Sequence, residues 1–170
     1  RGRALGVTMS LPAQDRYSYD KEYMLNQISM LFGGRIAEEV FMNQMTTGAS
    51  NDFERATHIA RDMVTRYGMD PEFCFVVYEE KQQNFLNPNG HGVNGCLVSD
   101  RTAQQIDAAV RSIIDETFAL SMGIMATNRE VLERCARTLL EKETLLEKEL
   151  VEMTGDLKRL DDTGFRAAAA

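Results

Sequence analysis

Several features that would classify a protein at once are missing from this sequence. It has only three cysteines, Cys74, Cys96 and Cys135. Their odd number and wide spacing exclude a disulfide framework and a Cys-x-x-Cys metal site, so a reducing compartment is expected. No apolar run approaches the ~20 residues needed to cross a bilayer. The sequence also does not open on a secretory signal.

Basic residues are also in short supply. Lysine and arginine number 19 against 26 aspartate and glutamate, which gives a net charge of -7. This balance argues against a nonspecific nucleic-acid binder, because phosphate contacts need clustered basic side chains. The chain of 170 residues is 44% hydrophobic and 26% charged, which is typical of one globular domain with a real core.

Strand signals are few. Residues 5–11 alternate apolar and small or polar side chains up to Pro12, which predicts a half-buried strand. A second short strand-like run covers residues 73–78. Residues 79–98 are polar and rich in Asn-Gly and Pro-Asn turns, which indicates a long loop or hairpin.

Helical periodicity dominates the rest of the chain. The patterns predict five helices, which begin at Ser18, after the loop of residues 46–51, at Ser99, at Asn128 and at Thr144. The first runs to about Phe41, the second stops at Gly68, and the fifth covers residues 145–153. The predicted fold is therefore mainly α with a minor β element. Gly33 and Gly34 lie inside the first helix, where they are either a tolerated weakness or, as we favour, the site of close approach of another backbone.

The predicted apolar stripes define which helix faces are buried. In the first helix the stripe is Met24, Ile28, Leu31, Phe32, Ile36 and Val40. In the second it is Ala56, Ile59, Ala60, Met63, Val64 and Tyr67. In the third an alternating spacing of four and three gives Ile106, Val110, Ile113, Thr117, Leu120 and Ile124, a seam for antiparallel packing. In the fourth it is Val131, Leu132, Cys135, Ala136, Leu139 and Leu140.

Asp52 is the most informative polar residue. It lies one turn before Ala56, so its carboxylate shares the apolar face in the first turn of the second helix. An acid there is either satisfied by free helix N–H groups or serves as a metal ligand or catalytic acid. His58 is displaced by about 240° around the helix, on the face of Arg55 and Asp62, and so cannot join Asp52.

The remaining candidates are weaker. His91 lies in a glycine-rich loop, and lone histidines of this kind are usually exposed or structural. Glu38 and Glu39 lie near the end of the first helix, where solvated acids are the default; Glu38 is nearer the edge of the apolar stripe. Residues 141–149 alternate acids and lysines and indicate a solvated face.

Five motifs, in order, carry a family resemblance. They are Arg-Ala-Leu-Gly-Val-Thr-Met-Ser-Leu-Pro at 3–12, Gly-Gly-Arg-Ile-Ala-Glu-Glu at 33–39, Thr-Gly-Ala-Ser-Asn-Asp at 47–52 with Ala-Thr at 56–57, Asn-Arg-Glu at 128–130 and Leu-Leu-Glu-Lys-Glu-Thr at 139–144. Over about residues 1–150 the chain resembles the peptidase domain of the FtsH family of membrane-bound AAA ATP-dependent zinc metalloproteases. The Thr-Gly-Ala-Ser-Asn-Asp string is the most specific of the five.

The resemblance implies a role for two of the acids. Family members bind zinc through the two histidines of a His-Glu-x-x-His helix and a distant aspartate, which corresponds to Asp52. The motif glutamate activates the zinc-bound water. Glu38 is a candidate for an acid that orients a ligand histidine. The strand at residues 5–11 offers an edge for main-chain pairing with an extended substrate.

The resemblance also implies partners and a location. Family members use ATP and magnesium on a separate ATPase domain, form hexameric rings and degrade unfolded and membrane proteins in protein quality control. They are anchored in a membrane by N-terminal segments, with this part at the cytoplasmic face, and a bacterial inner membrane is expected. The helices after Ser99 are the expected subunit-contact surface, and no nucleic-acid partner is expected.

The sequence departs from the family pattern in its motifs and in the loop of residues 79–98, which is divergent. It contains neither His-Glu-x-x-His nor a Gly-x-x-x-x-Gly-Lys-Ser/Thr phosphate loop. The family's Leu-Gly-Pro after the second helix is replaced by Asp-Pro-Glu-Phe-Cys-Phe at residues 70–75. We therefore expect residues 1–166 to be the C-terminal portion of a zinc metallopeptidase domain, with an alanine tail at 167–170. No catalytic residue is expected within this chain, and the fragment alone is expected to be inactive. The alternative is a noncatalytic helical oligomerisation or interaction module.

Overall fold

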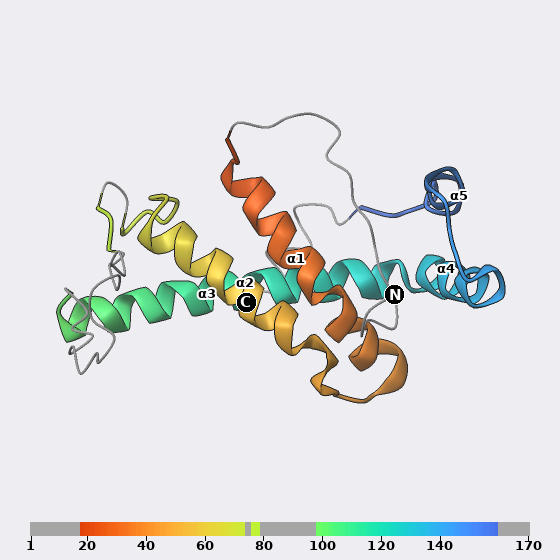
Figure 1. Cartoon of the computed structure of the whole chain (residues 1–170), viewed down its shortest axis with the longest axis horizontal. Helices are drawn as coiled ribbons and strands as arrows, with labels where there is room; N and C mark the ends of the chain where they lie inside the picture. The colour runs from red at the N-terminus through yellow and green to blue at the C-terminus, as the bar shows by residue number, and fades with distance from the viewer. Residues whose placement is uncertain (1–17, 74–75, 79–97, 160–170) are drawn as a thin grey trace, which may run out of the picture.

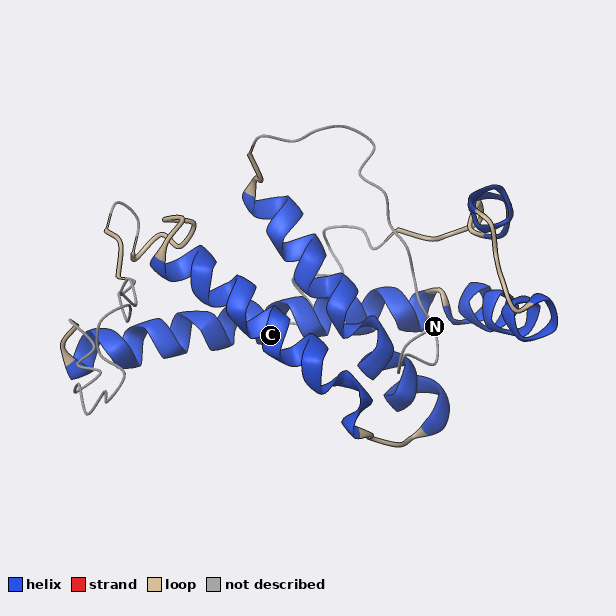
Figure 2. Ribbon diagram, in the orientation of Figure 1, coloured by secondary structure: helices blue, strands red, loops and turns tan. Residues whose placement is uncertain are grey.

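A computed structural model of the chain describes residues 18–73, 76–78 and 98–159. Its α-helices are α1 (Lys21–Ala37), α2 (Ser50–Thr65), α3 (Asp100–Thr127), α4 (Arg129–Lys142) and α5 (Glu147–Met153). A π-helical turn, η1 (Glu38–Met42), extends α1, and a 3-10 turn, η2 (Thr47–Ala49), precedes α2. The mainly α prediction is confirmed, and the described residues contain no strand (Figure 2). The strand predicted at residues 5–11 lies outside the described residues, as do residues 74–75 of the second run.

Three helices form the core. Figure 1 shows α3 as the long helix that α1 and α2 both cross. Phe32 of α1 lies at their junction, with its ring edge-on to Phe118 of α3 at 5.3 Å and tilted against Phe53 of α2 at 6.1 Å. The predicted stripes of α1 and α2 are confirmed, although Tyr67 at the end of the second is 49% exposed. The buried core cluster is Ile28, Phe32, Ile36, Ala56, Ala60, Met63, Val64, Phe73, Ile106 and Val110.

The seam predicted for α3 is correct only in its first half. Ile106, Val110 and Thr117 are buried as expected, but Ile124 is 38% exposed and Ser121 is buried in its place. A strict alternation of three and four residues assumes a 3.5-residue period, whereas a straight helix drifts from it by about 20° per heptad. The drift brings the Ser121 hydroxyl to 2.6 Å from the Ser29 hydroxyl of α1.

Some of the predicted helix starts and stops are confirmed and others are wrong. Ser99 caps α3 by accepting the Thr102 N–H at 3.2 Å, and Gly68 has the positive φ of 60° that ends a helix. The first helix starts later than predicted, because Asp20 and not Ser18 is its N-cap and accepts the Tyr23 N–H at 2.7 Å. A carboxylate is the stronger acceptor at the positive end of a helix.

The starts of the last two helices also need correction. Thr144 does not cap α5; Leu146 occupies the N-cap, and its N–H donates to Glu149 Oε2 at 3.0 Å. Asn128 stands at the start of α4 as predicted, but its side chain makes no capping hydrogen bond. It is buried and bonds the backbone of Lys158 instead, because that partner lies beside it in the folded chain.

The two glycines of α1 are not explained by a neighbouring backbone. A Cβ built at Gly33 or Gly34 meets no heavy atom of the described chain within 4 Å. The predicted close approach is therefore wrong for the part of the chain that the structure describes. Glycine is tolerated there because the three-helix core supplies most of the stability of α1, and each glycine costs only about 1 kcal/mol relative to alanine.

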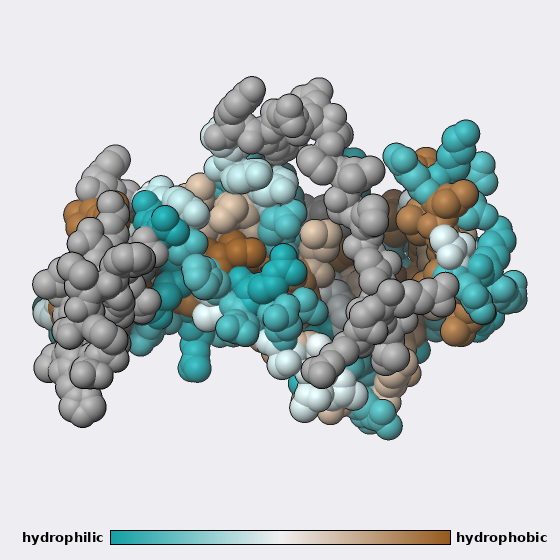
Figure 3. Space-filling view, viewed as in Figure 1, coloured by the Kyte–Doolittle hydropathy of each residue, from teal (hydrophilic) through white to brown (hydrophobic). Residues whose placement is uncertain are grey.

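Helices α4 and α5 form an arm at one end of the core (Figure 1). Arg134 ties α4 to the chain after α5 through the Met153 carbonyl at 2.6 Å and Asp156 at 2.7 Å. Figure 3 shows apolar surface at this end. Its exposed apolar residues are Leu139, Leu140, Leu146, Leu150, Val151 and Leu157. The stripe predicted for α4 is therefore wrong in its second half, because Ala136, Leu139 and Leu140 are exposed and Val131 is the buried residue of this helix. Among the described helices, none is both long enough and apolar enough to span a membrane.

Candidate functional site

The site lies where the chain reverses direction between α1 and α2. The Glu38 carbonyl accepts the N–H of Asn43, which closes the π-helical turn, and the N–H of Gln44 at 3.4 Å. Asn43 has the left-handed φ of 49°, a conformation in which asparagine is well tolerated. The reversal sends residues 44–46 back toward the start of α2. A π-helical turn of this kind is often found at functional sites.

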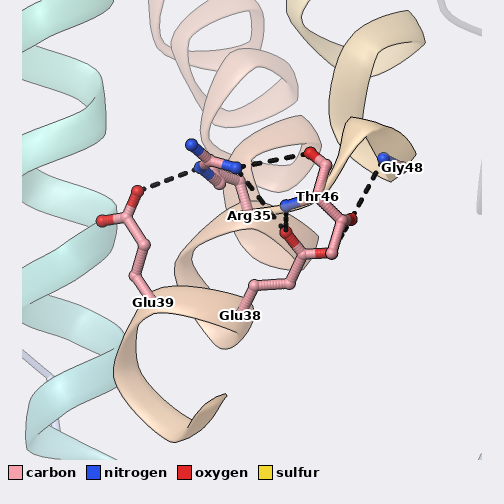
Figure 4. Close-up of polar contacts among 5 residues, drawn as sticks. All are labelled: Arg35, Glu38, Glu39, Thr46 and Gly48. Carbon is pink, nitrogen blue, oxygen red and sulfur yellow. Dashed lines mark hydrogen bonds and ion pairs between the residues drawn. The ribbon is translucent and has the colours of Figure 1, made fainter. Parts of the chain in front are cut away.

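The Glu38 side chain fastens the returning segment (Figure 4). One carboxylate oxygen accepts the Thr46 hydroxyl at 2.5 Å and the other accepts the Thr46 N–H at 3.1 Å. The Thr46 hydroxyl oxygen in turn accepts the Gly48 N–H at 3.1 Å. These two bonds from Thr46, with a smaller contribution from Arg35, hold the pKa of the Glu38 carboxyl below its ordinary value of 4.5. Glu38 thus connects the end of α1 to the turn that begins α2.

Asp52 lies in the first turn of α2, as predicted, and is half-buried. Within the described residues its carboxylate makes no hydrogen bond or ion pair, so the interpretation of an acid satisfied by helix N–H groups finds no support there. The neighbouring Phe53 packs against Phe32 of α1, which anchors this turn to the core. A half-buried carboxylate on an anchored turn has the chemistry of an oxygen ligand for a metal ion.

His58 faces away from Asp52, which confirms the predicted helical phase. Its side chain is 74% exposed, and its Nδ1 lies 3.5 Å from Asp62 Oδ2. His91 lies outside the described residues. Across residues 18–73, 76–78 and 98–159, no group of three or more histidine, cysteine, aspartate or glutamate side chains could hold a metal ion. The described residues therefore form no metal site around Asp52, and its role as a metal ligand stays a prediction.

Two contributors to this site were not singled out from the sequence. Thr46 donates a hydrogen bond to Glu38, and Arg35 forms an ion pair with it. Arg35 also donates a hydrogen bond to Glu39, which was expected to be solvated. The spacing of Arg35 to Glu38 and Glu39, three and four residues, was the available signal for these ion pairs. That Glu38 orients a ligand histidine remains a prediction, because the contacts described for Glu38 are to Thr46 and Arg35.

The mainly helical fold is consistent with the peptidase domain that the sequence motifs resemble, and comparisons with known proteins support that resemblance. The sequence profile of Peptidase family M41 matches residues 1–153. An ATP-dependent zinc metalloprotease FtsH from Cupriavidus metallidurans is 50% identical over 145 residues, which are 85% of this chain and 22% of the relative. The protein of the same name from Thermus thermophilus is 43% identical over 149 residues, 88% of this chain and 23% of the relative.

The chain belongs to peptidase family M41, the family in which these FtsH relatives are found. A third relative, the ATP-dependent zinc metalloprotease FtsH of Acidobacterium capsulatum, is 45% identical over 145 residues. The chain spans a little more than a fifth of the length of these relatives, 22% and 23%. The resemblance stated from the five sequence motifs is thereby confirmed.

Proposed function

We propose that this chain is part of a membrane-anchored ATP-dependent zinc endopeptidase that degrades unfolded and membrane proteins, and that Asp52 is its third zinc ligand. The position of Asp52 carries the proposal. It closes the Thr-Gly-Ala-Ser-Asn-Asp motif, lies half-buried in an anchored turn, and has a carboxylate without a partner among the described residues. The metal and the ATP dependence are taken from the relatives, which are named ATP-dependent zinc metalloproteases.

The chemistry divides between this chain and the rest of the protein. Bound zinc would act as a Lewis acid and activate water for attack on a peptide bond. Asp52 would contribute one negatively charged oxygen ligand and fix the metal from the α2 side. The two histidine ligands and the catalytic glutamate would come from a His-Glu-x-x-His helix that this sequence does not contain. ATP and magnesium would bind a separate ATPase domain.

The proposed assembly is a homo-oligomer, a hexamer, at the cytoplasmic face of a bacterial inner membrane. The exposed leucines of α4 and α5 support contact with another subunit, because an apolar surface of this kind is costly to leave in water. The same leucines favour the second candidate function, a noncatalytic helical interaction module. Zinc-dependent proteolysis separates the two candidates.

The test compares Asp52→Ala with His58→Ala in the full-length protein. Loss of a ligand frees or misplaces the metal, so Asp52→Ala should remove most proteolysis and leave ATP hydrolysis largely intact. His58→Ala should preserve both, because His58 is exposed on another face of the same helix. Casein hydrolysis and ATP hydrolysis are measured at saturating zinc, with the isolated 170-residue chain as an inactive reference. Full proteolysis by Asp52→Ala, or any zinc-dependent proteolysis by the isolated chain, would refute the proposal.

A further inference from the structure

Arg35 contacts more segments of the candidate site than any other side chain shown in Figure 4. Its Nε donates to Glu39 Oε1 at 3.0 Å, and its Nη1 lies 3.6 Å from Glu38 Oε2. The same Nη1 donates to the Thr46 carbonyl at 3.5 Å. The centre of the guanidinium lies 5.8 Å from the centroid of the Phe53 ring. One side chain in the last turn of α1 therefore contacts the turn η1, the returning segment and the first turn of α2.

The arrangement depends on the planar guanidinium. Only 14% of the Arg35 side chain is exposed, so its partners are held with little competition from water. A guanidinium presents donors in a fixed fork and can lie over an aromatic ring at the same time. A lysine ammonium carries the same charge but is a compact point donor on a flexible stem, and it cannot reproduce this set of contacts.

The segment that Arg35 and Glu38 hold leads directly to Asp52. Thr46 bonds Glu38, Gly48 bonds Thr46, and α2 begins two residues after Gly48. The fit at Gly48 is close: a Cβ built there would lie 3.2 Å from the Thr46 hydroxyl oxygen. On its other side, Asp52 is followed by Phe53, whose ring lies beside the guanidinium. Residues on both sides of Asp52 are thus tied to Arg35.

We propose that Arg35 is a positioning residue of the peptidase, which holds the first turn of α2 so that Asp52 is preset for metal binding. The inference rests on the proposed function of Asp52 and adds a residue that acts through it. A ligand that is already ordered loses less conformational freedom when it binds a metal. Residues that support a metal ligand typically contribute 10- to 100-fold in metal affinity.

The test uses Arg35→Lys in the full-length protein, with Arg61→Lys as the matched control. Arg61 lies on α2, is 55% exposed and pairs only with Asp107 on the surface, at 3.5 Å, among the contacts described. Zinc affinity is measured by competition with a chromophoric chelator. We expect Arg35→Lys to weaken zinc binding by about 10- to 100-fold and Arg61→Lys to leave it unchanged.

A second measurement needs no metal. Amide hydrogen exchange in the zinc-free protein reports directly on residues 46–52. Arg35→Lys should speed exchange there and leave the core of α1 and α3 protected, whereas a general loss of folding would speed exchange everywhere. Phe53→Leu, which removes the ring but keeps an apolar side chain, should act in the same direction, and it replaces Arg35→Lys if that variant does not fold.

The outcomes separate this inference from the proposed function. If Asp52→Ala leaves zinc affinity intact, the proposed function fails. If Asp52→Ala abolishes zinc binding while Arg35→Lys and Phe53→Leu change neither zinc affinity nor exchange at residues 46–52, the positioning role of Arg35 is refuted. Weaker zinc binding together with faster exchange confined to residues 46–52 supports it.

Discussion

Replacing Asn128 with alanine should release the chain that follows α5 without unfolding the core. The Asn128 side chain is 4% exposed, and its amide makes a reciprocal pair with the backbone of Lys158. Its Oδ1 accepts the Lys158 N–H at 2.8 Å, and its Nδ2 donates to the Lys158 carbonyl at 2.9 Å. Nδ2 also donates to the Ile124 carbonyl at 2.9 Å. These bonds join the α3–α4 corner to a segment 30 residues away.

The free-energy cost of Asn128→Ala depends on which hydrogen bonds the substitution removes without replacement. The Ile124 carbonyl keeps a partner, because the backbone N–H of Asn128 already donates to it at 3.1 Å. The two bonds to Lys158 are worth about 1 kcal/mol each net. Because Lys158 is exposed, water replaces them in part, which leaves a loss of about 1–2 kcal/mol. That free energy corresponds to a factor of about 5–30 in the opening equilibrium.

Amide hydrogen exchange measures this opening at a single residue. In Asn128→Ala the Lys158 amide should exchange about 5- to 30-fold faster, while amides of the α1–α3 core keep their protection. Thr127→Ala is the control, since Thr127 is exposed at the same corner. Unchanged exchange at Lys158 would show that the amide pair does not hold the segment. Equal acceleration throughout the core would show that the arm and the core open as one unit.

Two further predictions concern the core and the site. Phe32→Ala should lower the free energy of unfolding by about 3–5 kcal/mol, because Phe32 is buried in the core. The control is Met30→Ala, because Met30 is 60% exposed on the same helix, and it should cost no more than about 0.5 kcal/mol. Both free energies are measured by urea titration followed by circular dichroism, and equal losses would contradict the assigned burial. Because the pKa of Glu38 is lowered in the folded chain, its bond to Thr46 stabilises the fold fully at pH values above the ordinary pKa of 4.5. This stabilisation is lost as the pH falls through the folded-state pKa. A carboxyl ¹³C titration should place the Glu38 midpoint below 4.5, and Thr46→Val should move it back up; a midpoint at or above 4.5 in the unmodified chain would refute the assignment.

Local patterns in the sequence were enough to predict the helices and the buried faces of α1 and α2, but of the stripe predicted for α4 only Val131 is buried. Ile28, Phe32 and Ile36 follow the 3.6-residue period, and their burial is confirmed. The same period placed His58 away from Asp52, which the exposure of His58 confirms. Gly68 and Ser99 were identifiable because a helix stop and a helix cap depend on residues that are adjacent in the chain. The motif order likewise identified the family.

Contacts between distant segments were decided only by the tertiary structure. Asn128 has the composition of a helix cap, yet it bonds Lys158, because the fold brings that backbone beside it. Ser121 is buried against Ser29 because the faces of α3 rotate relative to an idealised seam once the helix packs on α1. In the sequence Arg35 has no feature that distinguishes it from other helix arginines. Its contacts with Thr46 and Phe53 form only because the folded chain reverses after η1. Periodicity shows which face of a helix is apolar. The partner of a polar side chain depends instead on how segments distant in the sequence pack together, and periodicity within one helix carries no information about that packing.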